Sequence, residues 1–188
     1  MEFIENKNFR DKKYSENELV TGEYGGCSFT NCNFSNANLS EIAFTECKFE
    51  NCDLSMAKLV NTTFGDVEFN NCKLLGLRFD SCNKTTVALC FNYCNLNFSS
   101  FFKLKLKKTN FDNCKLEEVE FAETDLTGSV FNKCDLVRAV FENTNLEGCD
   151  FRTSFNFSIN PEINRIFKAK FSHQNIAGLL SKYNITIE

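Results

Sequence analysis

The sequence of 188 residues contains eleven cysteines and a single histidine, and these side chains are its first candidates for chemistry. Four residues separate Cys27 from Cys32 and Cys47 from Cys52, a spacing close to that of some zinc sites. Frequent cysteines are also typical of secreted proteins held together by disulfides. Because His173 is the only histidine, we expect neither a Ser/His/Asp triad nor a metal site with two histidines.

A repeat of five residues explains the placement of the cysteines better than a metal site does. From Phe29 to Phe79 and again from Phe91 to Phe151, every fifth residue is Phe or Leu. The residue two positions earlier is mostly small, often Cys or Ala, and nine of the eleven cysteines fall in this slot, Cys82 and Cys90 being the exceptions. A helix repeats its apolar face near 3.6 residues and a strand repeats at two. The period of five instead indicates a unit with one small and one large residue facing inward and three polar residues facing outward.

A second period of twenty residues groups these units in fours. Residues twenty apart match in type, as in the series Phe29, Phe49, Phe69 and the series Phe91, Phe111, Phe131, Phe151. The two series stay in register if two extra residues are inserted between Phe79 and Phe91. The sequence therefore predicts an all-β solenoid of four-sided coils, with an insertion of two residues within 81–88.

Four-sided coils make a specific prediction about the core. Phe111 should stack on Phe91 and Phe131 and should not lie beside Phe101. Phe111→Ala should then cost about 3–5 kcal/mol because it leaves a cavity, whereas Asn113→Ala on the outside should have almost no effect.

The inward slot predicts that the thiols are buried. The first residues, MEFIENKNFRDKK, contain no apolar stretch of signal-peptide length. We therefore expect a cytoplasmic, reducing setting in which the thiols stay free, although cysteines stacked one coil apart could approach the distance of a disulfide. The longest apolar run, Val87 to Phe91, is far too short for a membrane helix.

The same slot argues against catalysis. A Cys-His pair would need Cys149 to meet His173, and an inward thiol would be buried and not activated. The pair Gly25-Gly26 lacks the Lys and the helix of a phosphate-binding loop. We expect no enzyme activity, no metal, no cofactor and no small-molecule substrate.

Residues 156–188 have a different pattern, which predicts a cap for the solenoid. Asn160 and Pro161 are typical of a helix start, and four apolar residues then follow helical spacing: Ile163, Ile166, Phe167 and Phe171. A second helical set follows His173: Ile176, Leu179, Leu180 and Tyr183. Ile185 and Ile187 alternate as in a short strand.

The five-residue units resemble those of the pentapeptide-repeat family. Units such as CNF, CKF, CDL, ANL and TNL cover residues 24–155, and weaker units at Phe9, Tyr14 and Leu19 are in phase. Residues 1–23 are therefore expected to form an N-terminal cap and irregular first repeats. The resemblance implies a right-handed quadrilateral β-helix. The tail, NPEINRIFKAKF followed by GLLSKYNI, is similar to the terminal module of the Qnr quinolone-resistance group. That similarity implies a homodimer through Ile163, Ile166, Phe167, Phe171, Leu179, Leu180 and Tyr183.

Charge is distributed unevenly along the chain, whose formal net charge is -4. Residues 1–80 carry 8 basic and 13 acidic side chains, whereas residues 81–155 carry 9 and 10. The acidic candidates for a partner surface are expected to point outward: Glu41, Glu46, Glu50, Asp53, Asp66 and Glu68. The lysines between Lys103 and Lys108 alternate with Leu104 and Leu106, which indicates a solvated side of the coil, and we expect no direct binding of nucleic acid.

Two functions remain open at this point. The resemblance to the Qnr group implies a bacterial DNA mimic that binds DNA gyrase or topoisomerase IV and protects it from quinolones or modulates it. The alternative is an interaction scaffold for another cytosolic protein. The Qnr proteins that protect gyrase carry long loops on their coils, whereas this register is interrupted by two residues only.

Overall fold

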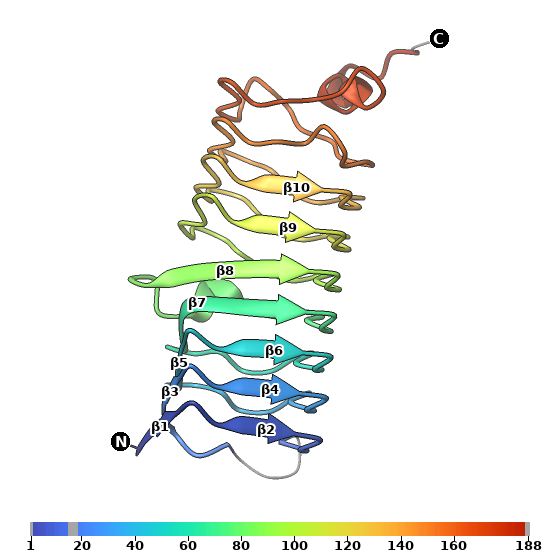
Figure 1. Cartoon of the computed structure of the whole chain (residues 1–188). Coiled ribbons are helices and arrows are strands. Elements are labelled where there is room, and N and C mark those ends of the chain that lie inside the picture. Colours follow the sequence, from blue (N-terminus) through green and yellow to red (C-terminus); the bar gives the residue numbers. More distant parts are fainter. Residues whose placement is uncertain (1, 15–18, 187–188) are drawn as a thin grey trace.

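Each five-residue unit forms one short side of a coil and then turns a corner, and twenty residues complete one coil. The computed structural model describes residues 2–14 and 19–186. The coils stack into a rod with the two chain ends at opposite ends (Figure 1). The strands are β1 (Glu2–Glu5), β2 (Asn8–Arg10), β3 (Gly22–Gly25), β4 (Ser28–Thr30), β5 (Ala43–Thr45), β6 (Lys48–Glu50), β7 (Thr63–Asn70), β8 (Val87–Asn92), β9 (Asn110–Asp112) and β10 (Val130–Asn132).

Every strand pairs in parallel with the strand one coil away. On the first side of the rod, β1, β3, β5 and the start of β7 follow one another. On the second side the order is β2, β4, β6, the end of β7, β8, β9 and β10. The strand β7 passes the corner between these two sides and joins both ladders into one sheet.

The third and fourth sides are held by single parallel bridges at the same spacing. On the third side they run from Asn33 to Asp53 and Lys73, and on the fourth from Ser100 to Glu120. The predicted all-β solenoid with four-sided coils is confirmed.

The core consists of Phe and Leu side chains stacked along the rod. Phe111 is fully buried, and its ring stacks on Phe91 and Phe131 with centroid distances of 5.2 and 4.8 Å. Phe101, on the fourth side, also meets Phe111, edge to face at 6.1 Å. The stacking prediction is therefore confirmed, and the prediction that Phe101 would not lie beside Phe111 is wrong. The coil is so narrow that rings from opposite sides touch across its centre.

The corners place one residue of most units in the left-handed backbone region. Positive φ values recur at five-residue steps, for example at Asn31, Asn36, Glu41 and Glu46. Asn113 is one of these residues, with a φ of 51°. Because Ala is disfavoured at such φ values, the expectation that Asn113→Ala would have almost no effect is not supported by its backbone.

The extra two residues are accommodated on the first side of one coil. The 3-10 helix η1 (Phe79–Ser81) precedes an exposed turn at residues 83–86. The register of β7 with β8 shifts between the pairs Phe64–Val87 and Val67–Leu89, after which the regular ladder resumes. The core stays continuous there, since Phe69 and Phe91 stack at 5.6 Å.

The segment after Asn160 continues the solenoid, and the helix predicted there is wrong. Parallel bridges join Asn145 to Arg165 and Asp150 to Lys170. The inward positions are filled by Asn164 with Ile166 and by Ala169 with Phe171, which repeats the spacing of two within five. The buried Asn164 amide donates to the Phe141 carbonyl at 2.8 Å and so fixes this last coil.

Helix begins only after that coil. The described residues contain two short 3-10 helices there, η2 (Ile176–Leu179) and η3 (Ser181–Tyr183). Ile185 is not in a strand, and Ile187 lies outside the described residues. Within 2–14 and 19–186, no helix has the length and apolar character needed to cross a membrane.

Candidate functional site

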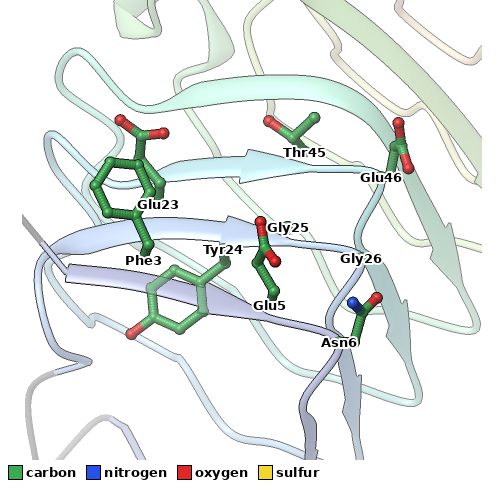
Figure 2. Close-up of a pocket in the computed structure, with 9 residues that line it drawn as sticks. All are labelled: Phe3, Glu5, Asn6, Glu23, Tyr24, Gly25, Gly26, Thr45 and Glu46. Carbon is green, nitrogen blue, oxygen red and sulfur yellow. The ribbon is translucent and has the colours of Figure 1, made fainter.

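Acidic side chains surround a hollow near the N-terminal end of the rod. The hollow has a volume of about 390 Å³ and is lined by Phe3, Glu5, Asn6, Glu23, Tyr24, Gly25, Gly26, Thr45 and Glu46 (Figure 2). In the ladder of the first side, Gly25 lies between Glu5 and Thr45. Because glycine has no side chain, the row of side chains along the ladder has a gap at this point, and the Glu5 and Glu46 carboxylates border the gap.

A second hollow of about 420 Å³ adjoins the first one and shares Glu46 with it. Its lining comprises Glu46, Cys47, Lys48, Asp66 and Glu68. Lys48 is the one cation in the two linings, and its ammonium lies 3.6 Å from the Glu68 carboxylate. We define the acidic surface as Glu5, Glu23, Glu46, Asp66 and Glu68. Carboxylates at this density attract a basic partner and steer its approach.

The structure brings together only part of the predicted acidic set. Glu46, Asp66 and Glu68 belong to the acidic surface, and Glu50 lies on the second side close by, exposed at the end of β6. Glu41 lies at a different corner, between the fourth and first sides. Asp53 lies on the third side, where it is half-buried and accepts a hydrogen bond from the Ser55 amide at 3.0 Å.

Sequence reasoning missed Glu5 and Glu23. The period of twenty contained the signal, since Glu5 stands twenty residues before Gly25 and Gly25 twenty before Thr45. The first units match the repeat weakly, and for that reason these two glutamates were not assigned to the same surface as Glu46.

The thiols of the stacked cysteines are buried and donate hydrogen bonds to backbone carbonyls. Each thiol donates to a carbonyl of the preceding coil at 3.3–3.6 Å, and the residues of this column are Cys32, Cys52, Cys72, Cys94, Cys114 and Cys134. At two inward slots outside this column, burial raises the pKa of the Cys47 thiol to about 11 and that of Cys149 to about 12. Such thiols are protonated near neutral pH and react slowly.

Threonine and serine make the same kind of hydrogen bond at other inward slots. The buried hydroxyls of Thr124 and Ser129 donate to carbonyls of the preceding coil, both at 2.8 Å. Cys, Thr and Ser therefore exchange in this slot because each is small and can donate to such a carbonyl, whereas Ala37 and Leu104 occupy it without a side-chain donor.

Neither the lone histidine nor the cysteines form a metal site among the described residues. His173 is exposed, whereas Cys149 is buried. Across the parts of the chain that the structure describes, no group of three or more His, Cys, Asp or Glu side chains is placed to hold a metal ion.

The lysine run lies on the surface, and two of its charges are paired. Leu104 and Leu106 are buried as expected. The ammonium of Lys103 lies 3.2 Å from the Glu123 carboxylate, and that of Lys107 lies 3.3 Å from Asp125.

The seven C-terminal candidates divide into core and surface residues. Ile166, Phe171 and Leu179 pack against the core, with Phe171 stacked on Phe151 at 5.4 Å, and Leu180 is half-buried. The side chains of Ile163, Phe167 and Tyr183 are exposed, by 45%, 64% and 52%. The first group closes the last coil, and the second is available to a partner.

Comparison with known proteins agrees with this geometry. The model of the pentapeptide repeat region matches residues 25–89 and 87–151. The chain belongs to the pentapeptide-repeat family. No curated protein sequence matches this pentapeptide-repeat chain.

Three solved structures of QnrB1, a plasmid-mediated fluoroquinolone resistance protein, share the pentapeptide-repeat fold of this chain. A trypsin-treated QnrB1 variant has a TM-score of 0.64 at 20% identity, with 96% of this chain and 98% of that chain covered. A second trypsin-treated variant has a TM-score of 0.65 at 18% identity over the whole of both chains. Full-length QnrB1 has a TM-score of 0.64 at 19% identity, covering 98% and 100%.

Proposed function

We propose that this pentapeptide-repeat protein is a non-catalytic, cytoplasmic interaction protein that binds a bacterial type II topoisomerase in place of DNA. The observation that carries the proposal is the acidic surface on a rod with the fold of QnrB1. A rigid row of carboxylates can replace the phosphates of a duplex against a basic saddle, and the interaction should weaken as salt rises.

The second part of the proposal is a homodimer formed at the C-terminal end. Exposed apolar side chains gather there, with Ile163, Phe167 and Tyr183 outside the core. Joining two rods at this end would place an acidic surface on each outer arm. Both arms could then contact a two-fold symmetric enzyme.

A gyrase supercoiling assay with and without a quinolone, over a salt series, tests the partner. We expect the protein to inhibit supercoiling or protect it from the drug at low salt, and the effect to fade at high salt. The triple variant Glu46→Gln, Asp66→Asn, Glu68→Gln should lose the effect. A control with the same charge change outside the acidic surface, Asp135→Asn, Glu142→Gln, Glu147→Gln, should retain it.

Absence of any effect over a large protein excess would refute the topoisomerase proposal. The remaining function would then be a scaffold for another cytosolic protein. Equal loss in both triple variants would show that net charge matters and that the acidic surface does not.

Sedimentation velocity tests the dimer separately. Phe167→Asp adds a charge to the exposed apolar end and should convert the dimer to a monomer. Val60→Asp introduces the same charge at an exposed position in the N-terminal half and should leave the dimer intact. A wild-type protein that sediments as a monomer at high concentration would refute this part.

A further inference from the structure

A third hollow lies on the opposite corner of the rod from the acidic surface. It has a volume of about 440 Å³ and is lined by Arg78, Phe98, Ser99, Ser100, Phe102, Glu118 and Glu120. The bridges Arg78–Ser100 and Ser100–Glu120 run along its floor on the fourth side. Two aromatic side chains and two carboxylates thus border one opening.

Phe98 is a bulky aromatic residue at a corner of the coil, outside the core. Its side chain is 55% exposed, and its backbone is left-handed with a φ of 63°. The equivalent corner positions one coil before and after hold Gly76 and Glu118. The corner itself requires a left-handed backbone, which Tyr93 also adopts at the preceding corner, but a bulky aromatic residue is disfavoured at such a φ. Phe98 therefore costs stability at the place where its ring borders the hollow.

The charges around this hollow leave one carboxylate without a cation. The guanidinium of Arg78 is paired with Asp80 at 2.8 Å, and that of Arg138 approaches Glu118 at 2.7 Å. Glu120 accepts a hydrogen bond from the Ala122 amide at 2.8 Å. It forms no ion pair with any of the described residues.

The second aromatic ring already attracts a cation from outside the hollow. The ammonium of Lys103 lies 4.6 Å from the centroid of the Phe102 ring. Lys103 does not line the hollow, and its charge is paired with Glu123. A cation inside the hollow would meet Phe98, Phe102 and the Glu120 carboxylate.

We propose that this hollow binds the guanidinium group of an arginine side chain on a protein partner. A guanidinium is planar, so it can stack on an aromatic ring while its N–H groups donate to a carboxylate. An ammonium group can also contact a ring and a carboxylate, as Lys103 does, but it has no planar face to stack on the ring. The inference is independent of the topoisomerase proposal, because it uses a different corner and none of the residues of the acidic surface.

The test uses the full-length, ¹⁵N-labelled protein and Nα-acetyl-arginine amide as the probe. We expect saturable shifts of amide signals confined to residues 98–102 and 118–120. Nα-acetyl-citrulline amide has nearly the same shape without the charge and should give no saturable shift. Nα-acetyl-lysine amide should bind more weakly than the arginine probe.

Two variants should each lower the affinity for the arginine probe by about 3- to 10-fold, the range expected for one aromatic or charged contact to a cation. They are Phe98→Asn, which places at the corner a residue that suits a positive φ, and Glu120→Gln. Tyr93→Asn is the matched control, since Tyr93 occupies the neighbouring corner of the same coil outside the hollow, with a φ of 56°. Spectra of all variants show whether the fold is intact.

Unchanged affinity in either Phe98→Asn or Glu120→Gln would overturn the site. Equal binding of the citrulline probe would overturn the role of charge, and equal binding of the lysine probe would overturn the assignment to guanidinium.

Discussion

Phe111→Ala is the perturbation that tests the stacked core most directly. The Phe111 ring is fully buried, with stacked neighbours on two sides and the rings of Phe101 and Phe121 edge-on at 6.1 and 5.9 Å. Burying such a side chain contributes about 3 kcal/mol. If roughly 50 Å³ of the removed volume stays empty, the cavity adds about 1 kcal/mol. The expected loss of unfolding free energy is about 3–5 kcal/mol.

Urea unfolding followed by far-ultraviolet circular dichroism measures this loss. The structure supplies a better control than Asn113→Ala, because Lys115 is exposed and lies on a regular side of the coil. Lys115→Ala should change the unfolding free energy by less than about 0.5 kcal/mol. Asn113→Ala should cost about 1 kcal/mol, since Ala is strained at a positive φ, whereas Asn113→Gly should cost much less.

The slope of unfolding free energy against urea must stay constant for these values to be compared. Equal losses for Phe111→Ala and Lys115→Ala would refute the inward and outward assignment. A loss below about 1.5 kcal/mol for Phe111→Ala would show that the neighbouring rings collapse into the space.

Three further outcomes are expected. Thr124→Val should lower the unfolding free energy by about 1 kcal/mol because the Phe101 carbonyl loses the Thr124 hydroxyl as a donor and keeps only the Leu104 amide, whereas Thr124→Cys should restore most of it in the same urea experiment. Native protein treated with iodoacetamide at pH 8 should be modified first at Cys90, because burial raises the pKa of both Cys90 and Cys47 but only Cys90 is partly accessible to the reagent. Mass spectrometry showing Cys47 modified as early would contradict this. Gly22→Ala should speed hydrogen exchange in β1, because its Cβ would lie 2.5 Å from a carbonyl oxygen of that strand, and Gly25→Ala, with its nearest atom at 3.8 Å, should not.

The solenoid was predictable because its core repeats at a period that neither helix nor ordinary strand shares. The same rule applied to Asn164 with Ile166 and Ala169 with Phe171 would have extended the coils past residue 160. The Asn160-Pro161 pair and the apolar spacing suggested a helix instead, although a buried Asn amide can replace a thiol as inward donor.

The candidate surface was less predictable than the fold. Outward residues have no period of their own, so grouping Glu46 with Asp66 but not with Glu41 or Asp53 required the side of the coil to which each belongs. The left-handed corners were visible only as a preference for Asn and Gly, which residues such as Met56, Tyr93 and Phe98 do not follow. The gap in the row of side chains at Gly25 arises because glycine has no side chain, and a hydrophobic pattern does not reveal such a gap.

The turn at residues 83–86 has a practical consequence. The Asn83 amide still donates to the Thr62 carbonyl at 2.9 Å, whereas residues 84–86 belong to no strand, and the regular pairing of β7 with β8 resumes at Val67 and Leu89. A foreign sequence, such as an epitope or a small fluorescent domain, can be inserted at this turn while the coils on either side keep their strand pairing. The rod then becomes a carrier that displays its cargo at a fixed height along its axis.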